Sequence, residues 1–210
     1  MVGRIITTDA CVAEGAEWLA YREPRFAQAL LVCGPLPLRR QADGFSALLS
    51  AIVGQQVSVA SANAVFVRLQ AAGLVDAVAL AAASDEALRA VGLSRQKARY
   101  GRALAQADID FHGLRDVANT DVIATLTAVP GIGRWTAEIY AMFALGRADV
   151  FAPGDLAMQE AAKVLFALDA RPSELALRAM AEDWSPWRSV AARVLWAYYA
   201  HIKLREGVRA

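Results

Sequence analysis

Apolar residues recur at spacings of three and four along most of the 210-residue chain. One apolar helical face of this kind is formed by Phe45, Leu48, Leu49, Ile52 and Val53. Ser58 is a candidate cap for the next helix, and Gly73 ends it. Helices are predicted at 59–71, 84–92, 94–107, 122–128, 134–145, 156–168, 173–182 and 186–204. Because no stretch is a convincing strand, the pattern predicts an all-α fold of about ten short helices.

The composition allows a packed helical domain but does not identify a ligand. Hydrophobic residues make up 57% of the chain, enough for a sizeable core. The 22 basic and 21 acidic residues nearly balance, which is mild evidence against a nucleic-acid partner but does not exclude a local patch. Cys11 and Cys33 are too few for an iron–sulfur cluster, and His112 and His201 stand alone in the sequence. Without a signal peptide or a bilayer-length apolar run, we expect an intracellular, cytoplasmic protein with no membrane partner.

One predicted turn has the composition of an anion-binding hairpin. Val129-Pro130-Gly131-Ile132-Gly133 joins the helices expected at 122–128 and 134–145. Gly131 and Gly133 permit positive φ and leave main-chain N–H groups without Cβ cover, at the positive end of the second helix. Such a helix start binds phosphate without a basic side chain. On the glycines alone, however, an ordinary turn between helices is the simpler interpretation.

Four motifs, well separated along the chain, resemble the helix-hairpin-helix DNA glycosylase superfamily. Their order along the chain is also the order in that family. LTAVPGIGRWTA, at 126–137, is similar to its hairpin, and VFAPGDLAMQ, at 150–159, is similar to its Gly/Pro-rich loop with a catalytic aspartate. IVGQQVSVASANAV, at 52–65, and WSPWRSVAARVLW, at 184–196, are similar to the bacterial AlkA-type 3-methyladenine DNA glycosylase II branch. The similarity runs from about Gly44 to Trp196 and covers most of the chain.

The resemblance implies a catalytic role for Asp155. A glycosylase flips the target nucleotide out of the stack and breaks the base–sugar bond through a cation-like sugar, which a fixed carboxylate stabilises. The residues alone favour a helix N-cap, because Asp after Pro-Gly is a preferred capping residue. The two roles are compatible, since a capping carboxylate is rigidly held. Whether Asp155 also activates the attacking water is left open.

Trp135 bears on the reaction type. In bifunctional relatives resembling endonuclease III, a lysine at this position attacks the sugar, whereas tryptophan cannot form a Schiff base. We therefore expect a monofunctional hydrolase that leaves the abasic site uncut. The resemblance also places Trp135 and Trp196 in the aromatic wall of the base pocket, with Ile139 and Leu156 where the AlkA type has tyrosines. Aromatic faces attract cationic 3-methyladenine and 7-methylguanine. Because this chain has fewer aromatic residues in the pocket than the AlkA type, we expect a broader or different lesion range.

The resemblance further implies DNA contacts by six residues: Gln55, Gln56, Ser58, Gly131, Gly133 and Thr136. Gln56 matches the wedge that fills the gap left by the flipped base, where the AlkA type has leucine. An exposed turn glutamine of no consequence is the alternative, and for Gln55 the two interpretations are nearly even. Arg95 and Lys97 are weaker phosphate candidates, because a solvated surface explains them as well. Trp18, Trp184 and Trp187 are interpreted as packing residues.

A monovalent cation, Na⁺ or K⁺, held by the carbonyls of Thr127, Val129 and Ile132 is also implied; no other cofactor is expected. The helical pattern begins near Ala13, which leaves no room for the N-terminal sheet domain of larger relatives. We expect a single glycosylase unit, 1–210, with two helical lobes flanking a DNA-binding cleft: a middle lobe at about 44–130 and a second lobe from 1–43 plus 131–210.

The expected function is a monomeric DNA glycosylase that excises alkylated bases, of the 3-methyladenine and 7-methylguanine type, from double-stranded DNA in base excision repair. Two alternatives remain open. One is a non-catalytic DNA-structure-binding protein that uses only the hairpin, and the other is a glycosylase for other damaged bases.

Overall fold

The computed structural model describes residues 2–205, and within them the fold is all-α, as predicted. Twelve α-helices and two short 3₁₀ helices form, and no strand is present in this part of the chain. The only isolated β-type pairing among these residues is an antiparallel bridge between Ile5 and Arg147. None of the helices within residues 2–205 is both long enough and apolar enough to span a membrane.

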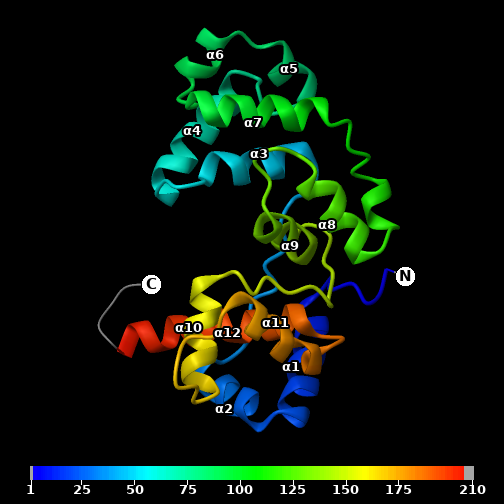
Figure 1. The fold of residues 1–210 in the computed structure, drawn as a ribbon, viewed down its shortest axis with the longest axis vertical. Coiled ribbons are helices and arrows are strands. Elements are labelled where there is room, and N and C mark those ends of the chain that lie inside the picture. The colour runs from blue at the N-terminus through cyan, green and yellow to red at the C-terminus, as the bar shows by residue number, and fades with distance from the viewer. Residues whose placement is uncertain (1, 206–210) are drawn as a thin grey trace. The chain divides into compact units, whose positions relative to one another are not determined.

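The helices divide into two compact units (Figure 1). The hairpin unit, Gln41–Tyr140, contains α3 (Phe45–Gly54), α4 (Val59–Ala71), α5 (Ala77–Ala82), α6 (Asp85–Ala90), α7 (Arg95–Gln106), η1 (Gly113–Arg115), α8 (Asn119–Thr127) and α9 (Arg134–Phe143) up to Tyr140. The aspartate unit, residues 2–40 and 141–205, contains α1 (Asp9–Arg22), α2 (Pro24–Cys33), α10 (Leu156–Leu165), α11 (Glu174–Met180), η2 (Ala181–Trp184) and α12 (Arg188–Arg205).

The boundary expected near residue 130 is too early, because most of α9 belongs to the hairpin unit. Two long-range hydrogen bonds explain the difference. The hydroxyl of Tyr140 accepts the main-chain N–H of Gly44 at 2.8 Å. The side-chain amide of Gln55 donates to the carbonyl of Gly131, also at 2.8 Å. The hairpin and the helix after it are therefore bonded to the start and the end of α3.

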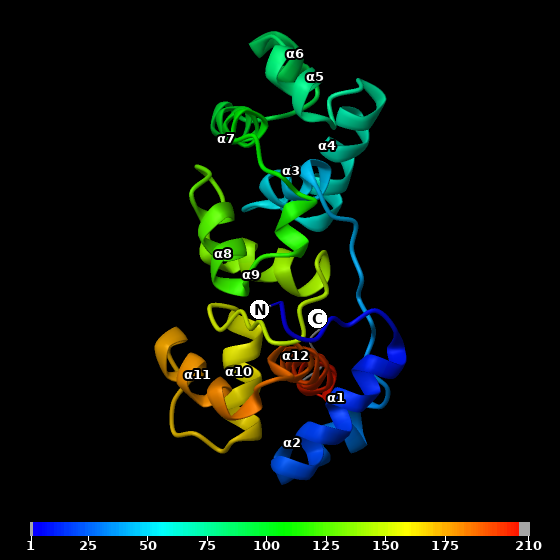
Figure 2. The same cartoon turned by 90° about the vertical axis from the view of Figure 1, so that its right-hand side faces the viewer.

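In the hairpin unit, α3 packs against both α4 and α7, and α7 also packs against α5 (Figure 2). The α3 residues that were predicted to form an apolar face are almost fully buried: Leu48, Leu49, Ile52 and Val53. Burying a side chain of this size stabilises the fold by about 1.5–3 kcal/mol. The predicted periodicity therefore identified the central helix of this unit.

In the aspartate unit, α12 packs against α10, α2 and α1. Its first half is buried, and Trp187, just before it, packs so closely on α1 that a Cβ at Gly15 would lie 2.6 Å from the indole ring. Trp184 and Trp187 are buried, as predicted for packing residues. Trp184 makes edge contacts with Phe26 and Phe151. Aromatic packing thus forms much of the core in this unit.

Three α-helices were given no bounds from the sequence, although helical pattern was expected from about Ala13. α1 begins at Asp9, where the Thr8 side chain accepts the N–H of Cys11 as an N-cap, and α2 follows it directly. α5, with the sequence AVALAA, is too short and too uniformly apolar to show a helical period. Its start is nevertheless marked by Asp76, whose side chain caps the helix.

Candidate functional site

The hairpin between α8 and α9 is a tight turn that leaves a helix start lightly covered. The Ile132 N–H donates to the carbonyl of Val129 at 3.0 Å, and the first helical bond of α9 runs from Ala137 N–H to Gly133 carbonyl at 3.1 Å. Gly133 is exposed, and a Cβ built on it would meet nothing within 4 Å. The N–H groups in the first turn of α9 have no acceptor within the helix. Main-chain N–H groups at such a helix start can bind an anion.

Gly131 has a φ of 93°, and a Cβ at this position would overlap the ring of Tyr100. Tyr100 lies on α7, where its hydroxyl accepts from the Gln96 side chain at 2.8 Å. From the other direction, Gln55 donates to the Gly131 carbonyl. Glycine is therefore required at 131 for both its backbone conformation and its contact with the tyrosine. Nothing in the sequence indicated that Tyr100 or Gln55 would lie here, because the partners are far apart in the chain.

The loop between α3 and α4, residues 55–58, holds Gln56 in the left-handed region with a φ of 56°. The side chain of Gln56 is exposed. A non-glycine residue in this conformation is uncommon and occurs often at functional sites. Ser58 closes the loop as the N-cap of α4, accepting the N–H of Ser61 at 3.2 Å. At the other end, the ammonium of Lys97 donates to the carbonyl of Val53 at 2.6 Å.

A groove of about 570 Å³ lies between the 55–58 loop, the start of α7 and the hairpin. Four of the predicted DNA contacts line it: Gln55, Gln56, Gly131 and Gly133. The sequence analysis did not select Ser94, Gln96 and Tyr100, which also line it, and gave Lys97 only a weak assignment. Partial burial lowers the pKa of Lys97 below its usual value. The structure therefore brings the loop and the hairpin together on one surface of the hairpin unit.

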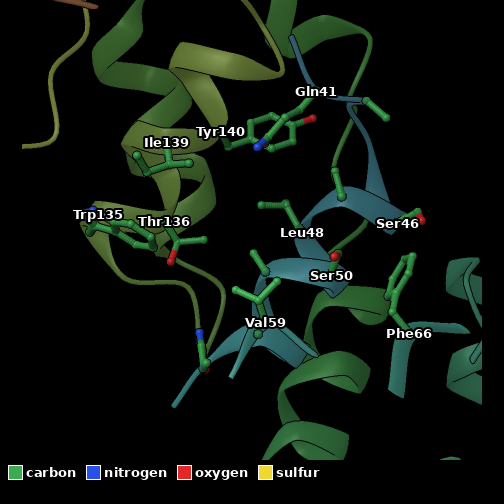
Figure 3. A pocket seen from close by; sticks show the side chains of 15 residues that line it. Gln41, Ser46, Leu48, Ser50, Val59, Phe66, Trp135, Thr136, Ile139 and Tyr140 are labelled. Carbon is green, nitrogen blue, oxygen red and sulfur yellow. The ribbon is translucent and has the colours of Figure 1, made fainter. Parts of the chain in front are cut away.

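A second cavity, of about 780 Å³, lies between α9 and α3 (Figure 3). Trp135 and Ile139, both predicted base-pocket residues, line it together with Thr136 and Tyr140. Trp135 is 46% exposed, whereas Thr136 is only 8% exposed. Burial raises the pKa of the Tyr140 hydroxyl to about 12. The described residues that line the cavity include no charged side chain, so its wall is formed by apolar, aromatic and neutral polar groups.

In the aspartate unit, Asp155 is the N-cap of α10. Its Oδ1 accepts the N–H of Met158 at 3.1 Å, and its main-chain N–H donates to Ala152 at 3.1 Å. The preceding loop is fixed by Gln159, whose side chain donates to the carbonyl of Pro153 at 2.7 Å. The capping interpretation is thus confirmed, and the carboxylate is half-buried and held at the positive end of a helix.

The other two predicted pocket residues also belong to the aspartate unit. Leu156 follows Asp155 and is 61% exposed. Trp196 lies on α12 and is half-buried, with its ring 5.7 Å from that of Phe143. The guanidinium of Arg39 lies over the Trp196 ring, 5.8 Å from its centroid. The sequence gave no indication of this arginine.

With this geometry described, the family of the chain can be stated. Residues 49–186 match the model of the HhH-GPD superfamily base excision DNA repair proteins. The chain therefore belongs to this superfamily, which confirms the resemblance seen in the four motifs.

Relatives within the superfamily have names that agree with the alkylated-base branch. DNA-3-methyladenine glycosylase 2 of Escherichia coli is 34% identical over 168 residues, which cover 73% of this chain and 57% of that protein. The crystal structure of a DNA-3-methyladenine glycosidase from Bacillus halodurans superposes with a TM-score of 0.81 at 33% identity and covers 93% of both chains. Schizosaccharomyces pombe 3-methyladenine DNA glycosylase (Mag1) in complex with abasic DNA gives a TM-score of 0.75 at 26% identity, covering 87% of this chain and 95% of that one.

The chain spans only part of several curated relatives. It covers 57% of the Escherichia coli protein and 39% of another relative.

Proposed function

We propose that the chain is a monofunctional DNA glycosylase that excises alkylated bases from double-stranded DNA and leaves an abasic site. The observation that carries this proposal is Asp155, a carboxylate fixed as the N-cap of α10 in a member of a base excision repair superfamily. Similarity to 3-methyladenine glycosylases, one of them crystallised with abasic DNA, supports the choice of substrate class. The bases expected are of the 3-methyladenine and 7-methylguanine type.

In the proposed reaction, Asp155 stabilises positive charge as it develops on the sugar. The bond between the sugar carbon and the base nitrogen breaks, the electron pair leaves with the base, and water adds to the sugar carbon. A carboxylate that is already oriented by the Met158 N–H needs no reorganisation as the charge appears. Such fixed electrostatic groups contribute about 10²- to 10³-fold to the rate.

The flipped base would be recognised mainly through apolar and aromatic surface. Trp135 and Ile139 line the uncharged cavity of the hairpin unit, and Leu156 and Trp196 are exposed or half-exposed in the aspartate unit. Because Ile139 and Leu156 provide no aromatic face, this lining is less selective for cationic bases than an all-aromatic wall.

For DNA binding we propose two elements of the hairpin unit. The first-turn N–H groups of α9, beside Gly131 and Gly133, bind a backbone phosphate. Thr136 contributes through its main-chain N–H, because its side chain is nearly buried. Gln56 is the wedge in the gap left by the base, and its exposed, left-handed position supports this role. Ser58 and Gln55 hold these elements in place.

We also propose a monovalent cation, Na⁺ or K⁺, on the carbonyls of Thr127, Val129 and Ile132. Thr127 ends α8, where the last carbonyls lack an intrahelical donor. The Val129 carbonyl accepts from Ile132 but has a second lone pair. The ion would add positive charge beside the bound phosphate. Replacing Na⁺ and K⁺ by tetramethylammonium at constant ionic strength should weaken DNA binding, and unchanged affinity would remove the ion from the proposal.

Trp135 supports the absence of lyase activity, because an indole cannot form the Schiff base through which a lysine cleaves the strand. Incubation of the protein with lesion-containing duplex, followed by direct gel analysis, should show intact strands until alkali is added. Breaks before alkali treatment would refute the monofunctional assignment.

The decisive experiment is mass-spectrometric identification of bases freed from alkylated DNA by the wild type and by Asp155→Asn. The wild type should release methylated purines, and Asp155→Asn should release almost none while still binding the DNA. Binding without release by the wild type would instead indicate a non-catalytic DNA-structure-binding protein. Release of only oxidised or mismatched bases would indicate a different lesion class. Sedimentation with and without duplex tests whether the protein is a monomer, as expected. We also propose that it acts on chromosomal DNA in a bacterial cytoplasm.

A further inference from the structure

Trp196 and Phe143 are neighbouring aromatic rings within the aspartate unit, and each of them also contacts a guanidinium group. The Arg39 guanidinium lies 5.8 Å from the centroid of the Trp196 ring. The Phe143 ring lies 5.7 Å from Trp196 at an interplanar angle of 36°. Beyond Phe143, the Arg193 guanidinium lies 4.8 Å from the phenyl centroid. Of these two arginines, Arg39 is exposed and Arg193 is 1% exposed.

The backbone next to Arg39 is held by the buried side chain of Arg193. Arg193 donates from Nη2 to the carbonyl of Leu38, the residue before Arg39, at 2.9 Å. It also donates from Nη1 to the carbonyl and hydroxyl of Ser189, at 2.8 and 2.6 Å. Arg39 itself has a φ of 50°, a conformation that a non-glycine residue keeps only where neighbouring contacts fix it. A buried arginine thus anchors the backbone from which the exposed arginine reaches the indole.

The region around Trp196 carries concentrated positive charge. Burial, together with the charges of Arg39 and Arg40, lowers the pKa of Arg193 to about 10. The positive charges of Arg39 and Arg40 therefore act on the guanidinium group of Arg193. A further cation placed on the same ring would be repelled by the same charges.

We propose that Arg39 is a specificity-determining residue that disfavours cationic bases relative to neutral purines at Trp196. The inference rests on the proposed function in one respect, that Trp196 contacts the flipped base.

The physical reason is competition for one π surface. A cation over an indole is stabilised by the ring quadrupole, and Arg39 already makes this interaction. With Arg39 over the ring, a positively charged methylated purine gains less cation–π stabilisation from Trp196 and is also repelled by the guanidinium. A neutral purine loses only part of its stacking area on the ring. The positive charge on a methylated purine weakens its own bond to the sugar, so such bases need less help from the enzyme.

The test compares binding of duplexes whose 2′-fluoro sugars prevent base release. One carries 7-methylguanine, which is cationic, and the other carries 1,N⁶-ethenoadenine, which is neutral. Relative to wild type, Arg39→Gln should raise affinity for the cationic duplex about three- to tenfold more than for the neutral one. Arg39→Lys, which keeps the charge, should stay near the wild-type ratio. Arg22→Gln is the matched control, because Arg22 makes the same kind of contact with Trp18, 4.9 Å from its centroid.

Replacing Trp196 by Leu separates this role from a structural one. In that background Arg39→Gln should no longer change the ratio, since the shared ring is gone. An equal change for both duplexes would mean that Arg39 binds a phosphate and would overturn the proposal. A shift of the same size in Arg39→Lys, or persistence of the shift without Trp196, would overturn it too. A parallel assay on cleavable duplexes measures base release separately. If the wild type releases no base, the glycosylase assignment fails, and this outcome is distinct from failure of the Arg39 proposal.

Discussion

The starts of α9 and α10 differ in the residue that precedes the helix. Each helix follows a loop that contains Pro-Gly, and each has a positive N-terminal end that favours a negative group. At α9 the residue before the helix is Gly133, which has no side chain to cap the amides. At α10 the corresponding residue is Asp155, whose carboxylate accepts the N–H of Met158.

This difference shows how a single residue decides what a helix start can do. A glycine leaves the amides available to an external anion, which in the proposed function is a phosphate. An aspartate provides the anion itself and is oriented by the amides, which in the proposed function stabilises a cationic sugar. Four predictions test this contrast, from the largest expected effect to the smallest.

Asp155→Asn should lower single-turnover base release by about 10²- to 10³-fold. The fold should remain intact, because asparagine is as good an N-cap as aspartate. Thermal unfolding alongside the kinetics would verify this. Asp76→Asn is the matched control, since Asp76 caps α5 in the same way, accepting from Ala79 at 2.9 Å. Loss of activity in Asp76→Asn, or near-normal activity in Asp155→Asn, would contradict the assignment.

Gly131→Ala should destabilise the protein by about 2–4 kcal/mol, because the new Cβ overlaps the Tyr100 ring and φ is positive. A Cβ at Gly133 meets nothing within 4 Å, so Gly133→Ala should cost only about 1 kcal/mol, because alanine is a poorer residue than glycine before a helix. It places a methyl group beside the first-turn amides of α9, so duplex affinity should fall. Urea unfolding and DNA titration of both variants measure the two effects. A stable Gly131→Ala, or undiminished DNA binding by Gly133→Ala, would show that the turn is ordinary.

Gln56→Ala should weaken binding to lesion duplex several-fold, about three- to tenfold, with little loss on single strands. Only the duplex has a gap to fill and a partner base to contact. Gln70→Ala, at another exposed glutamine of the hairpin unit, should change neither. Fluorescence anisotropy with both DNA forms measures the difference. Equal losses on the two forms would assign Gln56 to general backbone binding.

The start of α1 is a third helix start at which stabilisation of a negative group can be tested, and the expected effect is smaller. Hydrogen bonds from the Thr8 side chain and from backbone groups lower the pKa of the Cys11 thiol to about 6. Burial raises the pKa of Cys33, which ends α2. At pH 7 Cys11 should be mostly thiolate, so iodoacetamide should modify it before Cys33, and its rate should fall as pH drops through 6.

The same shift also links folding to pH. A thiol with a lowered folded-state pKa adds stability as pH rises from about 6 towards its unfolded value, and loses it as pH falls through 6. Peptide mapping after timed alkylation measures the rates. Equal rates for the two cysteines at pH 7 would show that this helix start does not favour negative charge.

The sequence was most informative about local structure. Gly131 and Gly133 were placed in a turn and Asp155 at an N-cap because turn and cap chemistry depends on near neighbours. The apolar face of α3 was identified because helical periodicity repeats within a few turns. Local signals of this kind predicted both helix starts that the proposed function uses.

Contacts between distant segments were not predictable. The bond from Gln55 to Gly131, the Tyr100 ring beneath Gly131 and Arg39 over Trp196 each join residues far apart in the chain. Contacts between single, mostly partly buried residues leave no periodic signal in the sequence. The lobe boundary was misplaced for the same reason, because it depends on the Gly44–Tyr140 bond rather than on local composition.

Because asparagine caps a helix as well as aspartate does, the position that begins α10 can lose its charge without loss of the fold. A single transition in an aspartate codon makes this replacement. On the proposed function, a protein with this change would remain folded and bind damaged DNA without releasing the base.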